Sequence, residues 1–169
     1  MHEFNRLLNL QSTARKKSLF LFGARQTGKT FLLKRQFPDS LYFDLLEPNT
    51  FFRFSRHPQS LTEELTAQQG SIQNPVIIDE IQKLPFLLDQ VHYLIENLHC
   101  TFILTGSSSR KLKRGGANLL GGRARVRHLY PLVFPEIPDF DLVRALNYGT
   151  ISSIYLSDEP KDDLNAYCG

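Results

Sequence analysis

The sequence predicts a three-layer α/β/α fold around a mostly parallel five-stranded sheet. Short apolar runs of strand length alternate with longer segments of helical periodicity, which is the pattern of an α/β domain. The chain has 169 residues, of which 41% are hydrophobic and 22% charged. That length is enough for one domain with a substantial core.

We expect strands at residues 18–22, 41–44, 75–79, 101–105 and 124–129. Helices are expected at 30–36, 60–69, 85–97 and 139–148, the third beginning with a proline and carrying leucines at helical spacing. Ser60 and Glu63 have the spacing of a capping box for the second helix. Three prolines at 131, 135 and 138 predict that the main domain, residues 1–137, ends there. Residues 138–169 then hold one helix and little else.

The first expected strand leads into a complete phosphate-binding loop. Residues 23–30 fit the pattern G-x-x-x-x-G-K-[ST] at every fixed position. Its glycines allow backbone N–H groups to gather around one anion, Lys29 places a positive charge at the phosphates, and Thr30 offers a hydroxyl to Mg²⁺. A glycine turn between strand and helix would explain the glycines but not the Lys-Thr pair. The predicted nucleotide-binding residues are Gly23, Ala24, Arg25, Gln26, Thr27, Gly28, Lys29 and Thr30.

The third expected strand ends in two acids, Asp79 and Glu80. A buried parallel strand delivers such side chains to the edge of the sheet where ligands bind. There Asp79 would hold the Mg²⁺ that Thr30 contacts, and Glu80 would orient and deprotonate the attacking water. An apolar strand ending in acids means little alone, but after a complete phosphate loop it indicates a nucleotide hydrolase.

Two further positions are candidates for contact with phosphate. The fourth strand ends in Thr105, followed by Gly106 and Ser107, and if it lies between the first and third strands, either hydroxyl could reach a γ-phosphate or water. The alternative is a plain Gly-Ser turn. Arg123 follows two glycines and could reach a phosphate of its own chain or of a neighbour.

Other functional classes receive less support. The two cysteines and five histidines form no metal or redox motif, and no apolar run approaches the ~18 residues of a membrane span. With no basic-plus-apolar leader at the start, we expect a cytoplasmic protein without membrane contact. The net charge of +3 is mild. Its basic clusters at 110–114 and 123–127 keep nucleic-acid binding open, although no aromatic platform accompanies them.

In combination, five segments resemble a family of prokaryotic AAA+ ATPases, uncharacterised ATP-binding proteins with an N-terminal ATPase domain and a C-terminal domain of unknown function. The segments are residues 21–30, 75–85, 102–108, 119–123 and 129–136. The resemblance implies an AAA+ core that uses ATP and Mg²⁺, an Arg123 that acts on a neighbour's γ-phosphate, and a homo-oligomer. Because the family's C-terminal domain normally runs further, residues 138–169 resemble its truncated beginning.

Three functions remain open at this stage. The leading one is an ATPase that binds ATP or ADP and hydrolyses ATP, with Lys29, Glu80, Thr105 and Arg123 at the chemistry and Thr30 and Asp79 at the metal. The second is a nucleotide-binding fragment without turnover. The third is a basic nucleic-acid-binding module, for which steep salt dependence would be diagnostic.

Overall fold

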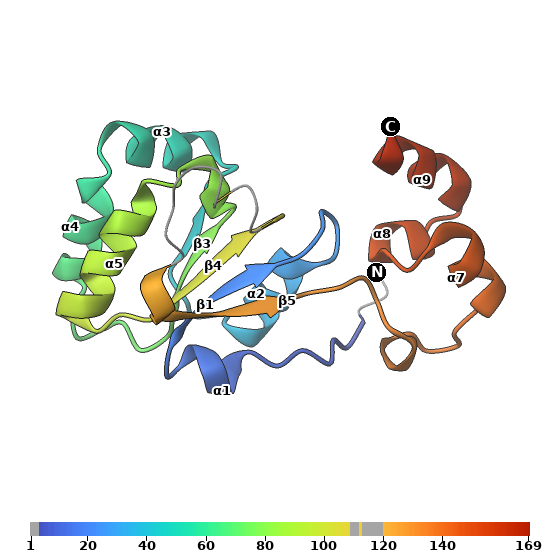
Figure 1. Cartoon of the computed structure of the whole chain (residues 1–169), viewed down its shortest axis with the longest axis horizontal. Coiled ribbons are helices and arrows are strands. Elements are labelled where there is room, and N and C mark those ends of the chain that lie inside the picture. Colours follow the sequence, from blue (N-terminus) through green and yellow to red (C-terminus); the bar gives the residue numbers. More distant parts are fainter. Residues whose placement is uncertain (1–3, 109–111, 113–119) are drawn as a thin grey trace.

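The computed structural model contains the predicted parallel sheet. It describes residues 4–108, 112 and 120–169. The sheet has five strands in the order β2-β3-β4-β1-β5, and all neighbouring strands run parallel. The predicted α/β/α fold is confirmed, with β4 between the two strands that lead into the phosphate loop and the acids (Figure 1).

Each strand begins and ends within one residue of its expected range. The strands are β1 (Ser18–Phe22), β2 (Tyr42–Asp44), β3 (Val76–Asp79), β4 (Phe102–Gly106) and β5 (Ala124–His128). The α-helices are α1 (Gln11–Ala14), α2 (Lys29–Gln36), α3 (Pro48–Arg56), α4 (Gln59–Ala67), α5 (Leu87–Leu98), α7 (Leu142–Tyr148), α8 (Ser152–Tyr155) and α9 (Pro160–Cys168). The described residues also form the short 3-10 helices η1 (Ile81–Lys83), η2 (Leu120–Gly122) and η3 (Phe134–Glu136).

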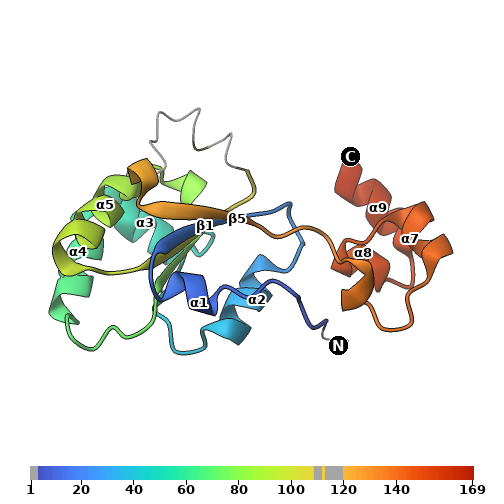
Figure 2. The ribbon, with the colours of Figure 1, turned by 60° about the horizontal axis from the view of Figure 1, so that its bottom comes forward.

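Alternating residues of the central strands serve two separate cores. Phe20 and Phe22 of β1 pack with α3, α4 and α5 on one face, in a cluster that also includes the buried Leu112. Leu19 and Leu21 pack on the other face with α1 and α2. Because side chains of a strand point alternately to opposite faces, an entirely apolar strand requires helices on both sides, and Figure 2 shows these layers.

The capping box predicted at Ser60 is wrong. Helix α4 begins one residue earlier, after Pro58, and no side chain caps it. The Ser60 hydroxyl instead donates to the His57 carbonyl at 2.7 Å, inside the first turn. Helix α3 was not predicted at all. It begins at Pro48, with the Glu47 carboxylate accepting from the backbone N–H groups of Asn49 and Thr50.

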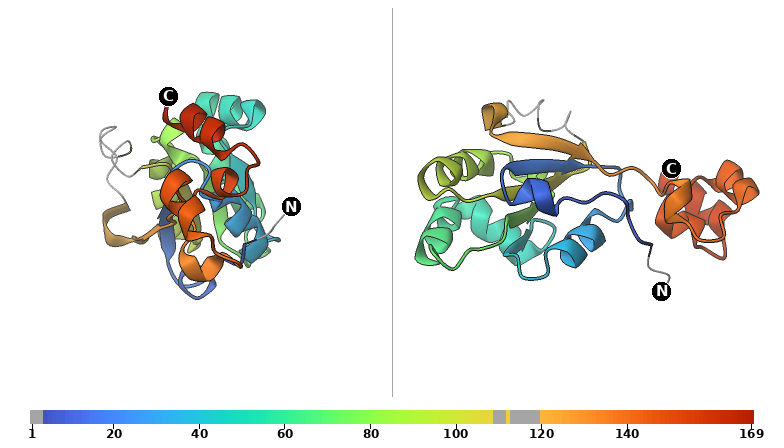
Figure 3. Two further views of the ribbon diagram at one scale, coloured as in Figure 1. Left: turned by 90° about the vertical axis from the view of Figure 1, so that its right-hand side faces the viewer. Right: turned by 90° about the horizontal axis from the view of Figure 1, so that it is seen from below.

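Residues 138–169 hold more structure than expected. Besides α7, they form α8 and α9, and Tyr155 joins Leu132 and Ile137 in a small apolar cluster. After β5 the chain runs as an extended segment to these helices, which lie beyond the carboxyl ends of the strands (Figure 3). None of the helices in the described part of the chain has the length and apolar character to span a bilayer.

Candidate functional site

The phosphate-loop sequence connects the end of β1 to the start of α2. Gly23 packs so closely that a Cβ built there would lie 2.4 Å from the Leu129 carbonyl oxygen. Gly28, the residue before α2, has a φ of 86°, in the left-handed region that glycine adopts without strain. The two glycines of the motif are therefore required for different reasons. A side chain at Gly23 would clash with the backbone of Leu129, and the backbone of Gly28 has a conformation that favours glycine.

The loop presents a row of free donors. The backbone N–H groups of residues 24–28 donate to no acceptor among the described residues. Loop N–H groups of this kind, leading into a helix N-terminus, provide a cradle for an anion. A hydrogen bond from the N-terminal segment also restrains the loop, because the Arg6 guanidinium donates to the Thr27 carbonyl at 3.0 Å.

Lys29 lies across the loop rather than out in solvent. Its Nζ donates to the Gly23 carbonyl at 2.8 Å and to the Ala24 carbonyl at 3.0 Å, and only 6% of the residue is exposed. Burial lowers the pKa of Lys29, while the negative charges of Glu80 and Asp79 oppose that change. The charges of the two acids predicted from the sequence therefore act on the predicted phosphate-binding lysine.

Asp79 is the polar centre of the site. Its Oδ2 accepts from the Thr30 hydroxyl at 2.9 Å and from the Tyr42 hydroxyl, and its Oδ1 accepts from Thr105. Burial, followed by the hydrogen bond to Asp79, raises the pKa of Tyr42, so its hydroxyl stays a donor. Thr105 reaches Asp79 because β4 is paired with β3 one residue earlier, at Leu104 and Ile78.

Glu80 is the second acid of the site, and its backbone is strained. Its φ of 60° and ψ of 44° lie in the left-handed region, which costs a residue with a Cβ about 1–3 kcal/mol. Its N–H donates to the Thr105 hydroxyl at 3.1 Å. Thr105 thus contacts both acids. Ser107, the other hydroxyl candidate, is half-buried just beyond β4.

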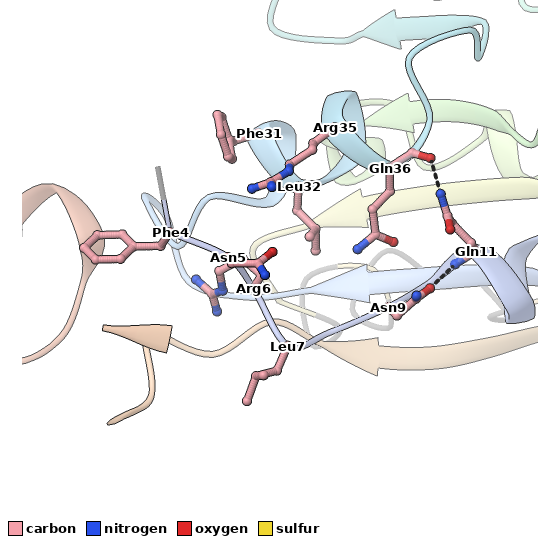
Figure 4. Close-up of a pocket in the computed structure, with 10 residues that line it drawn as sticks. All are labelled: Phe4, Asn5, Arg6, Leu7, Asn9, Gln11, Phe31, Leu32, Arg35 and Gln36. Atoms are coloured by element: carbon pink, nitrogen blue, oxygen red, sulfur yellow. Dashed lines mark hydrogen bonds between the residues drawn. The ribbon is translucent and has the colours of Figure 1, made fainter. Parts of the chain in front are cut away.

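A hollow of about 360 Å³ lies between the N-terminal segment and α2. Figure 4 shows Phe4 and Phe31 toward one end, and at the other Gln11, whose amide donates to the Gln36 carbonyl at 3.0 Å. Phe31 directly follows Thr30, and 40% of it is exposed. The side chains of Phe4 and Phe31 therefore line the hollow together with polar ones such as Arg35.

Comparison with known proteins identifies the family of this chain. A family model described as an AAA domain matches residues 15–138, most of the chain. This chain belongs to the AAA domain family. No curated protein matches it. Among solved structures it is similar to domain III of the Thermotoga maritima replication initiation protein DnaA, at 15% identity and a TM-score of 0.45, over 93% of this chain and 70% of that one.

Arg123 lies outside the site of its own AAA domain. It precedes β5, whose first residue Ala124 pairs with Ser18 at the start of β1, whereas the phosphate loop follows the end of β1. Five residues of strand, about 16 Å, separate the two edges of the sheet. The Arg123 guanidinium pairs with Glu96, an interaction that lowers the pKa of Glu96. Its action on a neighbouring chain stays a prediction. The basic cluster at 110–114 lies outside the described residues, apart from the buried Leu112.

A buried ion pair in this AAA domain was not predicted from the sequence. Arg6 and Glu136 are almost fully buried, with 8% and 4% of their side chains exposed, and their charged atoms are 3.2 Å apart. Arg6 bonds the Thr27 carbonyl in the loop and the Tyr130 carbonyl beyond β5. A separation of 130 residues leaves no local sequence signal for this contact.

The C-terminal helices also touch the loop. The Ser152 hydroxyl at the start of α8 donates to the Gln26 carbonyl at 3.2 Å, and the Ser153 hydroxyl lies 2.8 Å from the Gln26 side-chain oxygen. The Tyr167 hydroxyl in α9 donates to the Arg25 carbonyl at 3.4 Å. The predicted boundary near residue 137 therefore separates two segments that meet at the phosphate loop.

Proposed function

We propose that this AAA domain binds ATP with Mg²⁺ and hydrolyses it to ADP and phosphate. The observation that carries the proposal is the 2.9 Å hydrogen bond from the Thr30 hydroxyl to Asp79. It joins two motifs that are 49 residues apart in the chain and that serve one chemistry only when adjacent. Buried Lys29 and the free N–H groups of the loop supply the complementary positive field for the phosphates.

The residues fit a bound Mg²⁺. The Thr30 hydroxyl and the Asp79 carboxylate are hard oxygen ligands. The described part of the chain holds no group of three or more His, Cys, Asp or Glu side chains that could bind a metal ion by themselves. Mg²⁺ usually takes one or two protein ligands and completes its shell with phosphate and water oxygens. When bound, it would neutralise charge on the β- and γ-phosphates.

In the proposed reaction Glu80 accepts a proton from water as the water attacks the γ-phosphorus. The bond from phosphorus to the bridging oxygen breaks, and ADP leaves with that oxygen. Lys29 stabilises charge on the phosphate oxygens, and Thr105 holds both acids in place. The adenine base would occupy the hollow lined by Phe4 and Phe31, because an aromatic side chain can stack on a flat ring.

A second candidate is nucleotide binding without turnover by the isolated chain. It is favoured by the position of Arg123, at the edge of the sheet opposite the loop. An arginine supplied by a neighbouring molecule is worth ~10³–10⁵ in rate in other phosphoryl-transfer systems. If the first candidate holds instead, hydrolysis by the isolated chain should be slow and should rise with self-association. Nucleic-acid binding stays an unsupported alternative.

Binding is tested by thermal unfolding with and without Mg-ATP. At a concentration of about 100 Kd the nucleotide should add ~2.7 kcal/mol, which is about 5–10 °C in Tm for this size of chain. Lys29→Ala should lose most of that increase because it removes the buried cation of the loop. Lys17→Ala, at the opposite edge of the sheet, is the matched control and should keep it. A folded chain whose Tm no nucleotide changes would refute the proposal.

A further inference from the structure

Hydrogen bonds restrain both the backbone and the side chain of Glu80. Its backbone N–H donates to the Thr105 hydroxyl, and its side-chain Oε2 accepts from the amide Nε2 of Gln82. Gln82 lies in η1, directly after the strained residue, so the contact closes a tight local ring. A glutamate has three rotatable side-chain bonds, and this contact selects one arrangement among them.

The Gln82 side chain lies close against the end of β4. Its Oε1 is buried and has no hydrogen-bond partner among the described residues. A Cβ built on Gly106 would lie only 2.6 Å from that oxygen. Gly106 does not have the left-handed φ that would by itself require glycine. Its lack of a side chain therefore serves to make room for Gln82.

We propose that Gln82 is a positioning residue that holds the Glu80 carboxylate toward the attacking water. This inference rests on the proposed hydrolysis of ATP. The hydrogen bond occupies Oε2 of Glu80 and leaves its Oε1 for the water. Glu80 directly follows Asp79 at the carboxyl end of β3, and the phosphate loop follows the carboxyl end of β1, two strands away in the same parallel sheet.

The end of β4 then controls both acids. Thr105 bonds Asp79 and the Glu80 N–H, and the next residue, Gly106, sets the place of Gln82. A shift of this strand end would move the metal-binding and water-binding carboxylates together. Misplacement by about 1 Å costs up to ~10²-fold in rate, and loss of a partner that orients a ligand commonly costs 10–100-fold.

The test compares Gln82→Ala, Gly106→Ala and the double variant by phosphate release at saturating Mg-ATP and one protein concentration. Gln82→Ala should lower kcat by about 10–100-fold while the Kd for ATP changes less than ~3-fold. Gly106→Ala should also lower kcat, because its new methyl group displaces a flexible side-chain end rather than backbone. In the Gln82→Ala background it should have no further effect, since the residue it displaces is gone.

Gln90→Ala is the matched control. Gln90 is a half-buried amide in α5 that accepts one hydrogen bond, from Thr62 at 2.7 Å, away from the loop. It should retain the rate of the unsubstituted chain. Tm values identify any variant that fails to fold, and the two single substitutions provide independent routes to the same contact.

The outcomes distinguish the two proposals. If the unsubstituted chain turns over ATP and Gln82→Ala turns over equally fast, the role of Gln82 is overturned while hydrolysis stands. Additive losses from Gly106→Ala and Gln82→Ala would also overturn it, because each residue would then act separately. If the unsubstituted chain binds ATP but releases no phosphate, hydrolysis is overturned, and the positioning role with it.

Discussion

Removal of Glu136 should destabilise this AAA domain far more than removal of an exposed acid. Glu136→Ala would leave the Arg6 guanidinium, 8% exposed, without its counter-ion. It would also take the acceptor from the backbone N–H groups of Leu7, at 2.7 Å, and Val133, at 3.2 Å. Breaking a buried ion pair on one side costs about 3–5 kcal/mol. At about 2–4 °C per kcal/mol, Tm should fall by roughly 6–20 °C.

The assay is urea unfolding of both the unsubstituted chain and the variant, with Glu64→Ala as the matched control. Glu64 pairs with Arg53 at 2.7 Å, but 29% and 43% of the two side chains are exposed. An exposed pair of this kind contributes about 0–1 kcal/mol. Equal losses from Glu136→Ala and Glu64→Ala would refute the argument that burial gives the Arg6–Glu136 pair its importance.

Two other predictions concern the site and the assembly. Asp79→Asn should weaken Mg²⁺-dependent binding of ATP, because it removes the negative charge beside Thr30 that would hold the metal. Calorimetry with and without Mg²⁺ measures this effect, and an unchanged Mg²⁺ dependence would contradict the role of Asp79. If Arg123 acts on a neighbour's phosphate, hydrolysis per chain should rise with protein concentration, and Arg123→Ala should flatten that rise while the Kd for ATP is kept. A rate independent of concentration and of this substitution would show that one chain holds a complete site.

The sequence predicted the parts of the molecule that depend on local pattern. The strands β1, β3 and β4 are mostly apolar runs, and β5 alternates apolar and basic residues, so that their positions follow from local sequence pattern. The meeting of Lys29, Asp79 and Thr105 was predictable because the carboxyl ends of parallel strands share one edge of the sheet. In the structure Asp79 accepts hydrogen bonds from both Thr105 and Thr30, the residue after Lys29.

Contacts set by tertiary packing were not predictable from pattern. The Arg6–Glu136 pair joins two ends of the domain, and nothing near either residue marks it. Tyr42 reads as an ordinary strand aromatic until β2 is placed beside β3, which brings its hydroxyl to Asp79. The Ser60 error has a local cause: Pro58 starts α4 early, so the serine falls inside the first turn.

The most direct test is single-turnover phosphate release by the unsubstituted chain and by Glu80→Gln, each in sufficient excess to bind all the Mg-ATP. Both should bind ATP, because Glu80 is assigned to water and not to the phosphates or the metal. The unsubstituted chain should release phosphate, and Glu80→Gln should be slower by at least about 10²-fold, the scale of a positioned general base. Glu63→Gln, an exposed acid in α4, should retain the full rate. Equal rates for Glu80→Gln and the unsubstituted chain would contradict the central claim that Glu80 activates the attacking water.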